Sequence, residues 1–340
     1  MAHTEFATKR ALLIGVNNYA EMPPLKYCRR DATELSGVLQ KDLGFDPESV
    51  LEFVEDSKNL PQSARIFGAL GQIKNNGRVQ KDDLILFFFS GHGIIGKGGK
   101  DYLLPIETAR YNIEKTAIKI EDIVSELKDT GCNNIVMFID ACREMGGEKG
   151  VMSIGENSAE ALKTAGIVTF FACNPHDKSF EIEPLEHGSF TYCILEAIRQ
   201  GEAGTVAALE SYLRRQVPVI NDKYDKPTQS PYAIFEPQQK GELPIFVAPH
   251  QEAHDLANRE ELERGVGRKY NAGELPIDLF NKIAEYLDKE PAPSFDSNKR
   301  TILIRNLCSG DLSVAAFRIA WAAHEAGNVA DIKTTLKKKK

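Results

Sequence analysis

Short apolar runs alternate with amphipathic segments along most of the chain. Continuous apolar runs bounded by polar residues are typical of strands buried on both faces of a sheet. The predicted strands are Ala11–Val16, Val50–Val54, Leu84–Phe89, Ile135–Ile139 and Ile167–Ala172. Apolar residues recur at helical spacing between them, which predicts helices over Arg29–Leu43, Pro61–Asn76 and Ile120–Thr130. Because this alternation needs crossover connections, we expect an α/β fold with a mostly parallel sheet and helices on both faces.

Two residues suited to acyl transfer each follow one of these predicted strands. His92 lies in the run FFFSGHG, and Cys142 lies in the run IVMFIDACR. The carboxyl ends of neighbouring parallel strands meet at one edge of a sheet, so we expect the imidazole and the thiol at the same edge. A thiol is nucleophilic but little ionised at neutral pH, and a nearby imidazole can take its proton. Glycines on both sides of His92 allow a tight turn and the close approach of a substrate.

This arrangement resembles the caspase and metacaspase class of cysteine peptidases, in which a histidine precedes the cysteine by roughly 50 residues. Other segments that carry the resemblance are Asn17–Tyr19, Asp31–Ala32, Asp101–Pro105 and Gly188–Thr191. The resemblance extends from about Lys9 to Pro249 and implies a caspase-like three-layer sandwich. It also implies catalysis by His92 and Cys142, with the backbone N–H groups of Gly93 and Cys142 as the oxyanion hole. Since a cysteine at a strand end is often only a small buried hydrophobe, a catalytically silent signalling scaffold is the alternative.

The residues around this pair point to the substrate. Animal caspases cleave after aspartate and have glutamine two residues before the cysteine, where this chain has Asp140; Glu181 stands at one of their arginine positions. Metacaspases, which cleave after Arg or Lys, are more similar, because their pocket acids and serine match Asp31, Asp140 and Ser90. Two carboxylates can accept a guanidinium fork through charge-assisted hydrogen bonds. We therefore expect an endopeptidase acting on protein substrates after Arg or Lys, with an Asp-specific caspase as the alternative.

Each acid also has a purely structural interpretation. Asp31 can interact with the dipole of the helix that it opens. Asp140 can accept hydrogen bonds from loop amides, and Glu181 can be a solvated side chain. The adjacent Arg29 and Arg30 point in different directions on a helix, which favours solvated or ion-paired roles over an aspartate pocket.

Residues 143–163 contain four glycines and read as a flexible linker between a large-subunit-like part, ending at about residue 143, and a small-subunit-like part, 164–249. Caspase relatives are often cut here, so the resemblance implies self-cleavage at Lys149 or Lys163; an uncut loop covering the substrate is the alternative.

Many metacaspases need calcium, but residues 94–101 carry two lysines and one acid. Hard cations need several oxygen ligands, so we expect neither a metal site nor a cofactor.

The chain after the peptidase domain, 1–249, reads as a separate helical module, 250–340. Its predicted helices are Glu252–Arg264, Pro276–Lys289 and Leu312–Ala326. Helical appendages on caspase-like proteins commonly recruit partners, so we expect a regulatory or docking module that binds a protein partner or activator. A plain packing extension of the peptidase is the alternative.

Composition excludes several other classes of protein. A net charge of -7 argues against nucleic-acid binding, and no apolar run approaches the roughly 20 residues of a membrane span. The polar start of the chain is not typical of a signal peptide. Six scattered cysteines lack metal-ligand spacing, which favours free thiols in the cytoplasm. We expect Cys173 in the core, with a second nucleophile as the alternative. We expect His176 and His187 to be solvated in a polar loop, with a position at the border of the substrate cleft as the alternative. Roles in cell death or antiviral defence rest on analogy alone.

Overall fold

The computed structural model describes residues 6, 8–75, 79–96, 99–141, 144–145, 156–174 and 178–247. They belong to the first of the two units into which the chain divides, Met1–Pro249. The predicted helices of the tail fall in the second unit, His250–Lys340, and lie outside the described residues.

A six-stranded sheet forms the centre of this first unit. Its strands are β1 (Lys9–Gly15), β2 (Val50–Phe53), β3 (Leu84–Gly91), β7 (Asn134–Ala141), β9 (Val168–Phe171) and β12 (Tyr232–Ile234). They are ordered β12-β9-β7-β3-β1-β2, and every pair is parallel except β12 with β9. The apolar runs form strands because both faces of the sheet are covered and every residue of β3 is buried. The prediction of a mostly parallel α/β sheet is confirmed.

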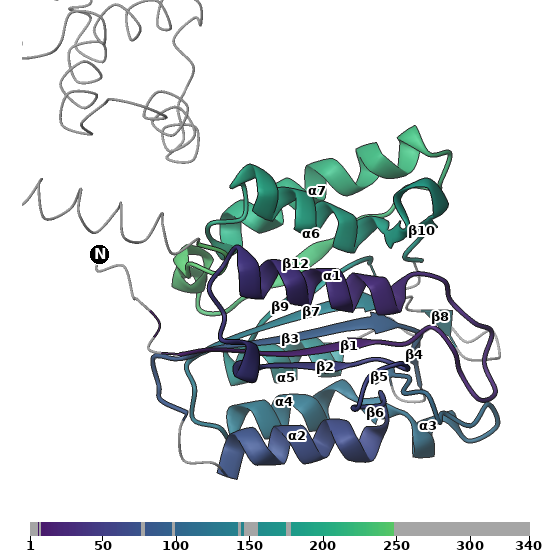
Figure 1. Cartoon of the computed structure of the whole chain (residues 1–340), viewed down its shortest axis with the longest axis horizontal. Helices are drawn as coiled ribbons and strands as arrows, with labels where there is room; N and C mark the ends of the chain where they lie inside the picture. The colour runs from purple at the N-terminus through teal and green to yellow at the C-terminus, as the bar shows by residue number, and fades with distance from the viewer. Residues whose placement is uncertain are drawn as a thin grey trace, which may run out of the picture. The chain divides into compact units, whose positions relative to one another are not determined.

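Helices cover both faces of this sheet and make a three-layer sandwich (Figure 1). On one face lie α1 (Cys28–Lys41), α6 (Ser189–Gln200) and α7 (Val206–Lys223); on the other lie α2 (Ser63–Asn75), α4 (Ile120–Lys128) and α5 (Glu156–Ala165). Side chains alternate between the two cores, so Leu86 and Phe88 pack with the first set of helices, and Phe87 and Phe89 with the second. None of the helices in the described ranges is long and apolar enough to span a membrane.

Two smaller sheets and several short helical turns complete the described part of this unit. A four-stranded sheet has the order β6-β5-β4-β8. Its strands are β4 (Gly93–Ile95), β5 (Asp101–Leu103), β6 (Ile118–Lys119) and β8 (Glu144–Met145). A separate pair joins β10 (Glu181–Ile182) to β11 (His187–Gly188), and the remaining elements are α3 (Ile113–Thr116), η1 (Pro47–Ser49), η2 (Glu183–Leu185) and η3 (Gln238–Glu242). Elements of two to five residues are too short to show a hydrophobic period, so the sequence pattern did not predict them.

The predicted linker is partly helical. α5 occupies residues 156–165, and its Leu162 is fully buried. The four glycines that suggested flexibility all precede Glu156, so they carry no information about the helix that follows. Lys163 is exposed in the last turn of α5, whereas Lys149 lies outside the described residues.

Candidate active site

The strands that precede the two predicted catalytic residues are direct neighbours. In the parallel pair of β3 and β7, Ser90 is the register partner of Asp140 and Gly91 that of Ala141. His92 follows Gly91 in the chain, and Cys142 follows Ala141. The two strands therefore end at the same edge of the sheet, as expected. Cys142 itself lies outside the described residues.

The His92 imidazole is held by the loop that follows β1. Its Nε2 lies 2.8 Å from the carbonyl oxygen of Pro23. A carbonyl can only accept, so Nε2 carries a proton, and in the neutral imidazole Nδ1 is the nitrogen with the lone pair. The backbone N–H of His92 donates to the Tyr19 hydroxyl at 2.7 Å, and the two rings lie 4.8 Å apart between centroids. A side chain on Gly91 would come within 2.7 Å of that hydroxyl, so glycine is needed for this packing.

Asp31 is buried where α1 meets the carboxyl edge of the sheet. Its Oδ2 accepts from the Ser90 hydroxyl at 3.0 Å, and its Oδ1 lies 2.7 Å from His187 Nδ1. The backbone N–H of Gly188 lies 3.3 Å from Oδ1. Burial raises the pKa of Asp31 to about 7, against the hydrogen bonds from His187 and Ser90, which lower it. The side chain thus bonds to β3 and β11.

Asp140 lies in β7 and is also buried. Its Oδ1 accepts from the Ser179 hydroxyl at 2.6 Å, and its Oδ2 accepts from the Thr191 hydroxyl at 2.6 Å and the Thr191 backbone N–H at 3.3 Å. Burial raises the pKa of this carboxyl, and the bonds from Ser179 and Thr191 oppose the rise. The expected hydrogen bond from a backbone amide to Asp140 is present. It is one of the three bonds that this carboxylate accepts, and its donor, Thr191, lies in the first turn of α6.

The two carboxylates converge on Gly188. A Cβ atom there would lie 2.8 Å from Asp140 Oδ2 and 3.2 Å from Asp31 Oδ2, closer than ordinary contacts allow. The structure therefore brings together the predicted pocket residues Asp31, Ser90 and Asp140. Within the described part of the chain, the His187 imidazole is the only group able to carry a positive charge that bonds to either acid.

Glu181 lies beside this cluster in β10. Its Oε1 accepts from the backbone N–H groups of Lys26 at 2.8 Å and Tyr27 at 2.7 Å, just before α1 begins. The carboxylate therefore holds the backbone just before α1 and is not a freely solvated side chain. Its negative charge also contributes to the raised pKa of Asp140.

The prediction of a solvated His187 is wrong. Its side chain is buried, because the hairpin of β10 and β11 places it against α1, where Nδ1 faces Asp31 and Nε2 lies 2.9 Å from Glu34 Oε2. Gln229 is a second buried polar residue, and no motif in the sequence marks it. It donates to the carbonyl of Ala172 at 2.8 Å and accepts from Ser189 at 2.9 Å, which ties the end of β9 to α6. His176 lies outside the described residues.

The remaining expectations concern residues near this edge of the sheet. Arg29 forms an ion pair with Asp56, and Arg30 forms one with Glu186, so both arginines are engaged at the surface. Cys173 is fully buried, and its Sγ lies 3.6 Å from the carbonyl oxygen of Ala141, which agrees with a core position.

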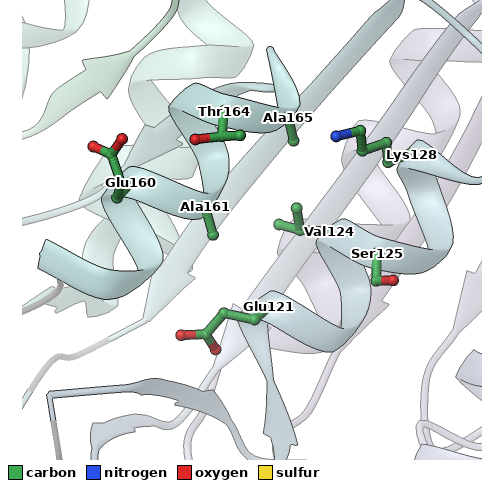
Figure 2. Close-up of a pocket in the computed structure, with 8 residues that line it drawn as sticks. All are labelled: Glu121, Val124, Ser125, Lys128, Glu160, Ala161, Thr164 and Ala165. Atoms are coloured by element: carbon green, nitrogen blue, oxygen red, sulfur yellow. The ribbon is translucent and has the colours of Figure 1, made fainter.

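A groove of about 430 Å³ lies between α4 and α5, two of the helices that cover the sheet face opposite α1 (Figure 2). Glu121 and Lys128 line it from α4, and Glu160 and Thr164 line it from α5. Neither His92 nor the acids around Gly188 line this groove, so it is separate from the candidate active site.

A mostly parallel sheet whose two neighbouring central strands lead into Ser-Gly-His-Gly and Asp-Ala-Cys defines a caspase-like cysteine peptidase. The caspase domain of peptidase family C14 matches residues 8–242, which is most of the chain, and the protein belongs to this family.

Metacaspases are among the curated relatives. Metacaspase-3 of Arabidopsis thaliana is 34% identical over 91 residues, which cover 26% of this chain and 25% of the relative. Metacaspase-1B of Aspergillus fumigatus is 33% identical over 88 residues, covering 25% of this chain and 21% of the relative. These matches span about a quarter or less of each relative. The crystal structure of protein GSU0716 from Geobacter sulfurreducens has a TM-score of 0.50 at 15% identity, covers 70% of this chain and 97% of that one, and shows the fold alone.

Proposed function

We propose that this peptidase is an endopeptidase that cleaves protein substrates after arginine or lysine. The observation that carries the proposal is the convergence of Asp31 and Asp140 on Gly188, with the Ser90 hydroxyl beside them. Two buried acids at one point repel each other unless a cation lies between or beside them. A guanidinium or ammonium group would supply that charge and accept the geometry of paired carboxylates.

The Asp-specific alternative requires a cationic pocket, and the charges at this edge have the opposite sign. A substrate aspartate would meet Asp31 and Asp140, with Glu181 close by. The nearby Arg29 and Arg30 are turned to exposed carboxylates on other elements. A buried pocket of this charge would therefore disfavour cleavage after an acidic residue relative to cleavage after a basic one.

The proposed chemistry uses the proton positions around His92. Nδ1 takes the proton of the Cys142 thiol, and the sulfur attacks the peptide carbonyl carbon to form a tetrahedral intermediate. The backbone N–H groups of Gly93 and Cys142 would stabilise its oxyanion. The C–N bond then breaks as His92 returns the proton to the leaving amine, and water hydrolyses the thioester to regenerate the thiol. The Pro23 carbonyl supports this role because it accepts from Nε2, which leaves Nδ1 as the acceptor nitrogen of the neutral imidazole.

Fluorogenic peptides that differ only in Arg, Lys or Asp at the cleaved position test this function. We expect cleavage of the basic peptides, loss of turnover by orders of magnitude in Cys142→Ala and His92→Ala, and little further loss in the double variant. Cys173→Ala is the matched control, since it removes another cysteine next to the same strand and should remain active. Asp31→Asn and Asp140→Asn should each lower kcat/KM by about 10- to 1000-fold, the effect of losing about 1.5 to 4 kcal/mol of charge-assisted bonding.

Two results would contradict the proposal. Preference for Asp over Arg would revive the Asp-specific alternative. Absence of cleavage in every peptide, despite a folded protein, would favour the signalling scaffold.

Regulation by self-cleavage and by a partner of the tail belongs to the same proposal. Lys149 is the favoured self-cleavage position, because Lys163 lies in a helix and proteolytic nicking prefers exposed loops. The module 250–340 would bind a protein partner or activator. We further propose a cytoplasmic enzyme, supported by the four free thiols among the described residues, and a pathway of cell death or antiviral defence, supported by family analogy.

A further inference from the structure

His187 is placed to control the charge of the pocket that we propose for basic side chains. Its side chain is 4% exposed, and both ring nitrogens face carboxylates. Nδ1 lies 2.7 Å from Asp31 Oδ1, and Nε2 lies 2.9 Å from Glu34 Oε2. A neutral imidazole has only one N–H to donate, whereas the imidazolium donates from both nitrogens. The geometry therefore fits the charged form.

The groups around His187 favour that charge. From α1 it faces Asp31 and Glu34, and Glu34 is in turn bonded to Arg199 of α6 and lies 3.7 Å from Arg30. The Tyr192 ring of α6 lies 6.5 Å away between centroids. The further charged residues nearby are Asp140, Glu181 and Glu186.

The pKa directions agree with the geometry. Burial alone would lower the pKa of His187, but its contacts with Asp31 and Glu34 raise it above the ordinary value. Burial acts to raise the pKa of Glu34, but Arg199 and His187 lower it overall, so this carboxyl is ionised and attracts the imidazolium. Among the described residues, Asp31 has no comparable arginine as a partner. Its ionisation in the empty pocket consequently depends on His187.

We propose that His187 is a positioning residue whose imidazolium orients Asp31 and extends to lower pH the range over which Asp31 is ionised while no substrate is bound. This inference rests on the proposed cleavage after basic residues. A cationic side chain then meets a carboxylate that is already charged, and no proton has to leave the pocket before it binds. Without the imidazolium, Asp31 would be protonated over a wider range of pH, and a protonated acid cannot form a charge-assisted bond.

The pH profile of kcat/KM on an arginine peptide tests this role. In His187→Gln, the side chain can still donate a hydrogen bond to Asp31 but carries no charge. An opposite charge at this distance lowers a carboxyl pKa by about 1 to 3 units, so its removal should move the acid limb about one unit or more to higher pH. Cleavage should recover toward the wild-type level at alkaline pH. A residue that only supported the fold would lower kcat/KM equally at every pH.

Glu34→Gln is the second variant, in case His187→Gln does not fold. It removes the outer carboxylate that favours the imidazolium, so the acid limb should shift in the same direction by a smaller amount. Glu210→Gln is the matched control, because Glu210 is also a helical acid paired with an arginine, Arg214, at 3.2 Å. It lies in α7, away from these contacts, and its profile should equal that of the wild type.

The rate at which iodoacetamide alkylates Cys142, measured from the mass of the peptide that contains this residue, separates this inference from the proposed function. The reagent has no basic side chain, so its pH dependence reports the thiol and His92 and should be the same in wild type and His187→Gln. Unchanged arginine-peptide profiles in both variants, or a loss that is uniform with pH, would overturn the role of His187 and leave the specificity intact. Failure of the wild type to cut arginine or lysine peptides would overturn the specificity and this inference together.

Discussion

The substitution Gly188→Ala tests whether Asp31 and Asp140 share one confined pocket. The added methyl group would lie 2.8 Å from Asp140 Oδ2 and 3.2 Å from Asp31 Oδ2. Gly188 has φ -63° and ψ 139°, which alanine adopts without strain. Any effect on cleavage would therefore come from contact with the acids and not from the backbone.

The structure sets the size of the effect. Favourable contacts begin near 3.5 Å, so the Asp140 carboxylate would have to move by roughly 0.7 Å. It is held by hydroxyl bonds of 2.6 Å from Ser179 and Thr191, which such a movement would stretch. Misplacement approaching 1 Å at a positioning group costs about 100-fold in rate, and overpacking costs about 1 to 3 kcal/mol of stability. We expect kcat/KM on an arginine peptide to fall about 10- to 100-fold.

The assay compares arginine-peptide cleavage, Cys142 alkylation and thermal unfolding in Gly188→Ala and a matched glycine variant. Gly37 lies inside α1, and a Cβ there would contact nothing within 4 Å. Gly37→Ala should leave kcat/KM unchanged and gain about 0.5 to 1 kcal/mol, because alanine favours the helix. Gly188→Ala should lose cleavage while alkylation continues. If its cleavage and stability equal those of the wild type, the confined pocket is refuted.

Three further predictions concern stability, maturation and the tail. The folded pKa of Asp31 is about 7 against an ordinary value of 3.8, so folding favours the protonated acid and its contribution to stability is lost as pH rises between these values. In denaturant titrations, the free energy of unfolding should fall less between about pH 4 and about pH 7 in Asp31→Asn than in the wild type. An unchanged dependence on pH would contradict this. Intact-mass analysis should find cleavage near Lys149 in active protein and none in Cys142→Ala; if both remain whole while the former cuts peptides, self-cleavage is not required. A chain ending at Pro249 should keep its peptide kcat/KM within about tenfold while processing of a protein substrate falls, since remote docking helps only large substrates. An unfolded truncated chain would show that the tail is part of the peptidase core.

The sequence alone determined five strands of the central sheet and the helices α1, α2 and α4 that pack on it, but its pattern of apolar residues did not predict β12, α6 or α7. The five predicted strands and three predicted helices all occur, with ends shifted by one to a few residues. Long apolar runs and helical periodicity are local signals. A strand buried on both faces needs a continuous apolar run, and a helix buried on one face needs apolar residues at helical spacing. Strand neighbours also follow from the parallel arrangement, which is why the runs before His92 and Cys142 could be placed at one edge.

Only the tertiary structure decided how the polar residues at that edge are paired. Asp31 and His187 are 156 positions apart in sequence, and no local pattern says that a loop histidine will be buried against a helix acid. The helix over 156–165 and the hydrogen bonds that Glu181 accepts from the backbone before α1 likewise depend on which elements pack together. A short polar segment has the same composition whether it is solvated or folded into a site. Its burial and pKa values arise only when distant elements exclude water and leave specific charges as its partners.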